Sequence, residues 1–144
     1  QDLFLIDASI EENIAFPIPR KSIDREKIIR ASKIACIANF IEELPNKYST
    51  FVGERGIKLS GGQKQRIGIA RAIYRDSKFM FFDEATSALD METEKNVIKS
   101  INKFTNDITL IMIAHRLDSL KNCDKIIKFK SRKIEVVSPE EIFK

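Results

Sequence analysis

The first half of the chain carries apolar residues at helical spacing. Ser22 is placed to cap a helix whose apolar residues then recur every three or four positions. One set comprises Ile28, Ala31, Ala35 and Ala38, and a second set comprises Ile34, Ile37, Phe40, Ile41 and Leu44. The pattern predicts helical structure as far as Pro45. Before it we expect a loop and a short helix, ended by the two prolines of FPIPR at residues 16–20.

A polar loop is expected over residues 46–58, and another helix from Ser60 to about Arg75. The pattern then changes. Residues 78–84, KFMFFDE, form a continuous apolar run that ends in two acids, which is typical of a strand buried on both faces. Residues 108–115, ITLIMIAH, repeat this pattern and end at the only histidine.

Asp90 precedes an acidic helical turn between these two runs. We expect a short helix over residues 116–123, two strands within residues 125–137 and a terminal helix over residues 138–144. A helical first half followed by alternating strands and helices predicts an α/β fold.

The composition supports one soluble globular domain, with 43% hydrophobic and 32% charged residues in 144. The apolar runs are too short to cross a bilayer. The first residues include neither a signal peptide pattern nor a starting methionine, so we expect a piece of a longer protein. Cys36 and Cys123 match no metal or redox spacing, which favours reduced cysteines in the cytosol.

The net charge is +4, yet the basic residues are dispersed among acids along most of the chain. The one cluster lies on the two predicted C-terminal strands and consists of Lys128, Lys130, Arg132 and Lys133. Lysines on solvated strands protect against aggregation, and no aromatic residues alternate with them as single-strand binding requires. We therefore expect no nucleic acid partner.

Ser60 and Gln63 stand three residues apart at the start of a helix, which is a capping-box pattern. Gly61 and Gly62 lie beside the first amides of that helix, which have no internal partner and carry partial positive charge. Glycines let a ligand approach the backbone closely. The pattern fits an anion site, most naturally for phosphate, but by spacing alone an ordinary capped helix is the better interpretation, because S-x-x-Q is common.

Three motifs decide between these alternatives. LSGGQ followed by KQR at residues 59–66 resembles the signature motif of ATP-binding cassette (ABC) ATPases. FMFFDEATSALD at residues 79–90 resembles their Walker B strand, catalytic glutamate and D-loop, and IAH at residues 113–115 resembles their switch-histidine loop. The resemblance extends over the whole chain and implies a P-loop NTPase-like fold. It places the helical subdomain at about residues 2–75 and the later part of a mainly parallel α/β core at about residues 76–144.

Asp83 and Glu84 end an otherwise apolar strand, where adjacent side chains point to opposite sides and so serve different roles. By resemblance, Asp83 binds Mg²⁺ and Glu84 orients or deprotonates the attacking water. His115 corresponds to the residue that hydrogen-bonds the γ-phosphate, although a lone histidine is more often structural. Gln1 corresponds to the Q-loop glutamine, which reaches the metal.

The resemblance also implies cofactors and partners. It assigns Ser87 and Asp90 to the D-loop, which lies across a dimer interface. The phosphate-binding pattern G-x-x-x-x-G-K-[ST] is not found in these residues: Gly56 and Gly61 have its spacing, but Gly62 and Gln63 follow. Ser60, Gly61, Gly62 and Gln63 would therefore contact an ATP that a second ABC ATPase domain holds with Mg²⁺, in a homodimer or heterodimer.

TFVGERG at residues 50–56 and SIEENI at residues 9–14 resemble exporter sequences. In exporters this loop contacts the transmembrane domains, and Glu54 is the candidate contact residue. We expect an ATPase coupled to export, at the cytoplasmic face of a membrane such as the bacterial inner membrane. The alternatives are an ABC ATPase that acts on chromosomes or ribosomes, and a catalytically inactive fragment.

Overall fold

The computed structural model describes residues 3–83, 89–104, 108–113, 120–121, 123–130 and 133–143. The chain forms two compact units, Gln1–Met112 and Ile113–Lys144. Among the described residues, no helix combines the length and the apolar composition that spanning a membrane requires.

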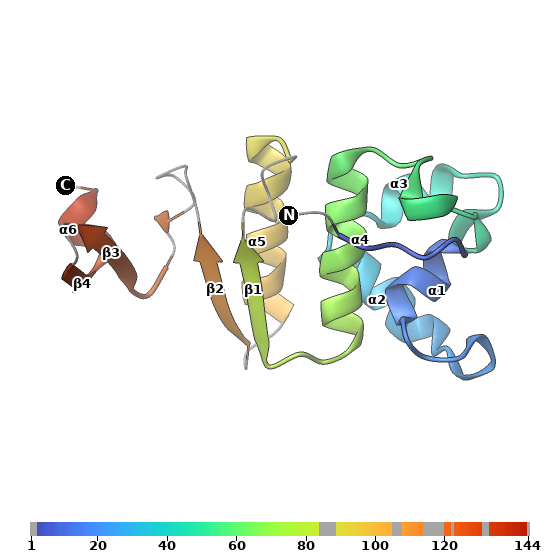
Figure 1. Ribbon diagram of the computed structural model, residues 1–144, viewed down its shortest axis with the longest axis horizontal. Coiled ribbons are helices and arrows are strands. Elements are labelled where there is room, and N and C mark those ends of the chain that lie inside the picture. Colours follow the sequence, from blue (N-terminus) through green and yellow to red (C-terminus); the bar gives the residue numbers. More distant parts are fainter. Residues whose placement is uncertain are drawn as a thin grey trace. The chain divides into compact units, whose positions relative to one another are not determined.

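The first unit begins with a group of helices (Figure 1). These helices are α1 (Ile10–Ala15), α2 (Arg25–Ile34), α3 (Ala38–Glu43) and α4 (Gly61–Tyr74). Short 3-10 turns lie at Arg20–Ser22, Lys47–Ser49 and Glu54–Gly56. Both α1 and α2 pack against α4, so the predicted helix from Ser60 to about Arg75 forms the centre of this part of the molecule.

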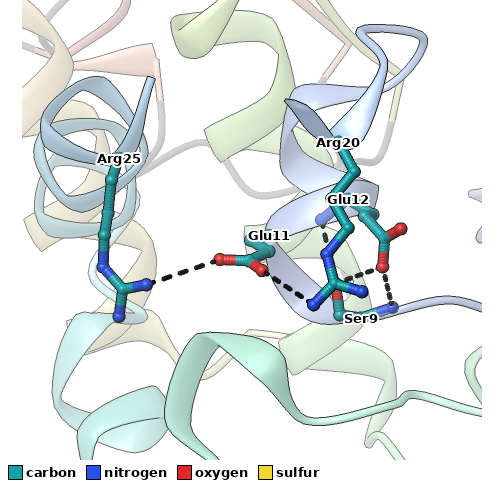
Figure 2. Close-up of polar contacts among 5 residues, drawn as sticks. All are labelled: Ser9, Glu11, Glu12, Arg20 and Arg25. Carbon is teal, nitrogen blue, oxygen red and sulfur yellow. Dashed lines mark hydrogen bonds and ion pairs between the residues drawn. The ribbon is translucent and has the colours of Figure 1, made fainter. Parts of the chain in front are cut away.

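Helix α1 is short but has a complete capping box, shown in Figure 2. The Glu12 carboxylate accepts hydrogen bonds from the Ser9 backbone N–H at 3.0 Å and from the Ser9 hydroxyl at 2.5 Å. These hydrogen bonds lower the pKa of Glu12. Next to it, Glu11 forms ion pairs with Arg20 at 4.0 Å and Arg25 at 3.9 Å. The helix is thereby joined to the chain that follows it.

The helical stretch predicted from Ser22 to Pro45 is two helices, and Ser22 is not its cap. Asp24 caps α2, since its Oδ1 accepts a hydrogen bond from the Lys27 N–H at 3.1 Å. The stretch breaks because Cys36 has φ 55°, a left-handed conformation that cannot continue a helix. After the break, Ile37 and Ile41 belong to the same buried core as the apolar residues of α2.

The second part of this unit contains β1 (Phe79–Asp83), α5 (Met91–Phe104) and β2 (Thr109–Ile113). The strands β1 and β2 pair with each other, and Figure 1 shows them running in the same direction. Helix α5 buries Val97, Ile98 and Ile101. The predicted strand–helix–strand order is therefore correct.

The expectation that both strands are buried on both faces is wrong. Along β1, Met80 and Phe82 are 2% and 5% exposed, whereas Phe79 and Phe81 are 70% and 68% exposed. Ile111 on β2 is exposed as well. One face of β1 packs into the core of this unit, and Leu110 and Met112 of β2 pack against that core partly buried, while the other face of both strands is largely exposed. A continuous apolar run indicates what a strand can bury, and burial itself depends on what packs on each side.

The core of this unit is continuous from the helices to the sheet. Its fully buried side chains include Leu5, Ile10, Ile14, Ile28, Ile37, Ile41, Tyr48, Val52, Ile67, Val97 and Ile101. Because the same cluster contains residues of α4, β1 and α5, the central helix and the strand–helix–strand element are packed as one body.

The second unit contains an antiparallel hairpin and a terminal helix, as predicted. Strands β3 (Ile126–Lys130) and β4 (Lys133–Val137) pair from Ile126↔Val137 to Lys130↔Lys133. Helix α6 (Pro139–Ile142) has a capping box between Ser138 and Glu141. The hairpin turn, and most of the short helix predicted over residues 116–123, lie outside the described residues.

Candidate functional site

The start of α4 has the geometry that its sequence predicts. The Ser60 N–H donates to Oε1 of Gln63 at 2.8 Å, and the Ser60 hydroxyl accepts from the Gln63 N–H at 3.3 Å. Both halves of the capping box are therefore formed. Ser60 is in extended conformation, so the chain turns into the helix at the glycine pair.

The capping box leaves two amides for a ligand. Lys64 N–H bonds to the Ser60 carbonyl and Gln63 N–H to the Ser60 hydroxyl. Within the described part of the chain, no hydrogen bond uses the N–H groups of Gly61 or Gly62. Gly61 is exposed, and neither glycine has a Cβ to keep an oxygen away. Two unpaired amides at the positive end of a helix dipole fit a phosphate group.

Arg66 holds this helix end in place, and the sequence analysis did not identify it. Its Nη1 donates to the Cys36 carbonyl oxygen at 2.7 Å, and its Nε donates to the Gly62 carbonyl oxygen at 3.3 Å. One guanidinium thus joins the glycine pair to the break between α2 and α3. The KQR sequence that follows the glycines is the only local sign of this role.

The loop before α4 depends on residues with positive φ. Gly53 has φ 75° and Gly56 has φ 67°, and Arg55 between them has φ 51°. The loop is joined to the body by the Val52 N–H, which donates to the Ala8 carbonyl oxygen at 3.1 Å. Glu54 is exposed on this loop, and so available for contact with another molecule, as its proposed role requires.

Asp90 caps α5. Its Oδ1 accepts from the Thr93 N–H at 2.9 Å, and its Oδ2 accepts from the Thr93 hydroxyl at 2.6 Å. These hydrogen bonds to the charged form lower the pKa of Asp90. The structure therefore gives this side chain a structural role, and its assignment to a dimer interface stays a prediction. Ser87 lies outside the described residues.

The predicted catalytic residues follow the ends of β1 and β2. Asp83 is the last residue of β1, and His115 lies two positions after the end of β2. Because the two strands run in the same direction, their last residues, Asp83 and Ile113, lie at the same edge of the sheet (Figure 1). Glu84, His115 and Gln1 lie outside the described residues, and so does the side chain of Asp83. Their roles stay predictions.

Comparison with known proteins decides the family. Residues 1–87 match the protein family described as "ABC transporter". The chain belongs to the ABC transporter family.

Individual relatives of this ABC transporter chain agree. It is 48% identical over 134 residues to the Escherichia coli "Alpha-hemolysin translocation ATP-binding protein HlyB", a match covering 93% of this chain and 19% of that protein. It is 46% identical to the Aggregatibacter actinomycetemcomitans "Leukotoxin export ATP-binding protein LtxB", over 100% of this chain and 20% of that protein. It is 47% identical to the Caenorhabditis elegans "Multidrug resistance protein pgp-1", over 93% of this chain and 10% of that protein.

A solved structure has the same fold. The "Structure of a bacterial Atm1-family ABC exporter with ATP bound" superimposes with a TM-score of 0.90 and 40% identity, over 99% of this chain and 25% of that chain. The predicted fold class is therefore confirmed: an α/β, P-loop NTPase-like ABC fold. The chain spans about a fifth or less of the length of these curated relatives.

Proposed function

We propose that this chain belongs to the ATP-binding and ATP-hydrolysing domain of an ABC exporter. The observation that carries the proposal is the start of α4, where Ser60 and Gln63 cap the helix and leave the two glycine amides unpaired. Membership of the ABC transporter family supports a nucleotide as the ligand. Relatives named as ATP-binding proteins of toxin translocation and export support the exporter type.

The amides of Gly61 and Gly62 would donate to the γ-phosphate of an ATP held mainly by a second ABC domain. A capped helix end presents these donors in a fixed direction, so no reorganisation is needed when the phosphate arrives. The partner domain, identical or different, would supply the phosphate-binding loop. Residues of about 2–75 would form the helical subdomain, and about 76–144 the α/β core half.

The hydrolytic residues would come from the ends of β1 and β2. Carboxylate and amide oxygens suit Mg²⁺, so Asp83 and Gln1 would hold the ion, which offsets negative charge on the phosphates. Glu84 would orient the attacking water and accept its proton. His115 would donate a hydrogen bond to the γ-phosphate. The D-loop residues Ser87 and Asp90 would face the partner domain.

The loop around Glu54 would contact the transmembrane domains on the cytoplasmic side of the membrane, such as the bacterial inner membrane. Glu54 is exposed, and Phe51 and Ile57, close to it in sequence, are exposed as well. An acid beside exposed apolar side chains suits a protein contact better than open solvent. Glycine at positions 53 and 56 permits the positive φ angles that this loop conformation requires.

The experiment compares variants of the full-length transporter. Glu84→Gln keeps the size of the side chain and one acceptor oxygen but cannot act as a base, so we expect ATP binding to be retained and hydrolysis to fall at least a hundredfold. His115→Ala is expected to impair turnover too. Unchanged hydrolysis in Glu84→Gln would overturn the assignment of the base, and a normal rate in His115→Ala would make that histidine structural.

The shared site has its own test. Because the partner would hold most of the nucleotide, the 144 residues alone are expected to bind ATP weakly or not at all in calorimetry. Micromolar affinity would contradict this arrangement. Arg75 is exposed at the other end of α4, so Arg75→Met serves as a control with unchanged hydrolysis in the full-length transporter.

A further inference from the structure

The segment of residues 3–6 lies against α4. It packs so closely on the glycines at positions 56 and 68 that a larger residue at either position would clash with it. A Cβ at position 68 would lie 2.7 Å from Cδ2 and 2.9 Å from Cδ1 of Leu3. Gly68 is therefore the gap in α4 into which Leu3 fits. Further along the segment, a Cβ at position 56 would lie 2.7 Å from Cδ1 of Leu5, which is fully buried.

Asn13 on α1 forms backbone-like hydrogen bonds with this segment. Its Oδ1 accepts from the Ile6 N–H at 3.0 Å, and its Nδ2 donates to the Ile6 carbonyl oxygen at 3.0 Å. Nδ2 also donates to the Ser9 carbonyl oxygen at 3.0 Å. The side chain is 0% exposed, so it acts as an internal strand partner for Ile6. A buried amide that is satisfied in this way fixes the segment in one position.

Arg71 on α4 completes the network. Its Nε donates to the Asn13 carbonyl oxygen at 2.7 Å, its Nη2 to Asn13 Oδ1 at 3.4 Å, and its Nη1 to the Phe4 carbonyl oxygen at 3.1 Å. The guanidinium lies over the Phe16 ring, 5.5 Å from its centroid. Burial, with the nearby charge of Arg75, lowers the pKa of Arg71, yet a guanidinium stays charged in proteins.

We propose that Arg71 is a positioning residue, which with Asn13 joins residues 3–6 and helix α4 into one rigid element. The inference rests on the proposed function. Arg71 follows Ser60 by eleven positions, which correspond to about 16 Å of helix. A displacement of the segment after Gln1 would therefore be transmitted along α4 to the glycine pair. We call the hydrogen bonds of Arg71 and Asn13 to residues 3–6 the joint. The joint sets where Ser60, Gly61 and Gly62 present their donors.

The direction of the hydrogen bonds distinguishes this joint from simple packing. A methionine at position 71 could cover the Phe16 ring but could not hold the Phe4 and Asn13 carbonyl oxygens. Removing the guanidinium leaves two acceptors without their donor and frees the segment, while the internal hydrogen bonds of α4 are unaffected. The expected defect is therefore loss of alignment between two intact elements.

The test uses Arg71→Met and Arg71→Lys in the full-length transporter, with the exposed Arg75→Met as the matched control. In Arg71→Met we expect KM for ATP to stay within twofold of wild type and kcat to fall about tenfold. Lysine keeps the charge and one donor group, so Arg71→Lys is expected to recover part of the rate. A wild-type kcat in Arg71→Met would overturn the proposal. A rise in KM alone would overturn it as well.

Amide hydrogen exchange gives a second readout that needs no nucleotide. In Arg71→Met, the Ile6 amide is expected to exchange at least tenfold faster, while amides within α4 keep their protection. Faster exchange of both the Ile6 amide and the α4 amides would mean general destabilisation and would overturn the proposal. Should Arg71→Met fail to fold, Arg71→Lys carries the same measurement. Because exchange does not depend on hydrolysis, this result separates failure of the joint from failure of the proposed function.

Discussion

Nη1 of Arg66 donates a 2.7 Å hydrogen bond to the carbonyl oxygen of Cys36, thirty residues earlier in the chain. Cys36 has φ 55° and separates α2 from α3. The bond therefore joins the break between two helices to the beginning of a third. It explains how the helix end with the glycine pair keeps its position although Ser60 and Gly61 are exposed.

Replacing Arg66 by Met is expected to lower the free energy of unfolding by about 1–2 kcal/mol, because a partly buried carbonyl oxygen loses its charged donor. Urea unfolding followed by circular dichroism measures the change. Arg75→Met, which removes an exposed arginine from the end of the same helix, is the control and is expected to change stability by less than about 0.5 kcal/mol. Equal losses in both variants would show that the Cys36 bond contributes nothing specific.

The contact between Gly68 and Leu3 predicts that Gly68→Ala has opposite effects on stability in the wild type and in a Leu3→Ala background. Gly68→Ala adds helix propensity of about 1 kcal/mol but places a Cβ against Leu3, so we expect a small net loss of stability. In a Leu3→Ala background the space is free, and the same change is expected to stabilise the chain by about 1 kcal/mol. Unfolding curves of the four proteins in this double-mutant cycle measure both effects. The same sign in both backgrounds would contradict the packing described.

Two glycines close together in the sequence are expected to respond differently to alanine. Gly56 has φ 67°, and a Cβ there would lie 2.7 Å from Leu5, so Gly56→Ala is expected to cost about 2 kcal/mol or more. Gly61 is the first residue of α4, where alanine is a good helix former, so Gly61→Ala is expected to leave stability unchanged or slightly higher. Thermal unfolding distinguishes the two, and an equal loss in both would count against this account.

The sequence predicted the features whose causes are local. Ser60 and Gln63 are three residues apart, and a capping box needs only those residues and the helix that follows. The pairs that hold the site together could not be predicted in this way. Arg66 bonds a carbonyl 30 residues away and Arg71 one 58 residues away, and their partners are backbone oxygens, which every residue has.

The errors have physical causes as well. Ser22 and Asp24 are both acceptable caps, and the structure uses Asp24, one turn before the buried Ile28. No pattern indicated the left-handed conformation of Cys36, which ends α2 in a Schellman motif, because that position is usually occupied by glycine or asparagine. Phe79 and Phe81 read as core residues since their apolar character gives no information about what covers them.

The cap of α5 predicts a pH dependence. Asp90 accepts two hydrogen bonds from Thr93 as a carboxylate, so its pKa lies below the ordinary aspartate value. This contribution to stability is present above the unfolded-state pKa of about 4 and is lost as the pH falls through the lower folded-state pKa. Asp90→Asn keeps an acceptor but does not titrate. The unfolding temperatures of the two proteins are measured between pH 6 and pH 2. We expect the difference in favour of wild type to shrink as the pH falls. A difference that stays constant with pH would argue against this role of Asp90.

The exposed rings of Phe79 and Phe81 give β1 one apolar face that favours self-association. Wherever this side is unshielded, during synthesis on the ribosome or in a purified sample, two copies gain free energy by stacking it together. The soluble yield of a preparation would then fall as the protein concentration rises, unless another polypeptide covers this face of the strand. A serine at position 81 would be the simplest way to make these residues easier to handle.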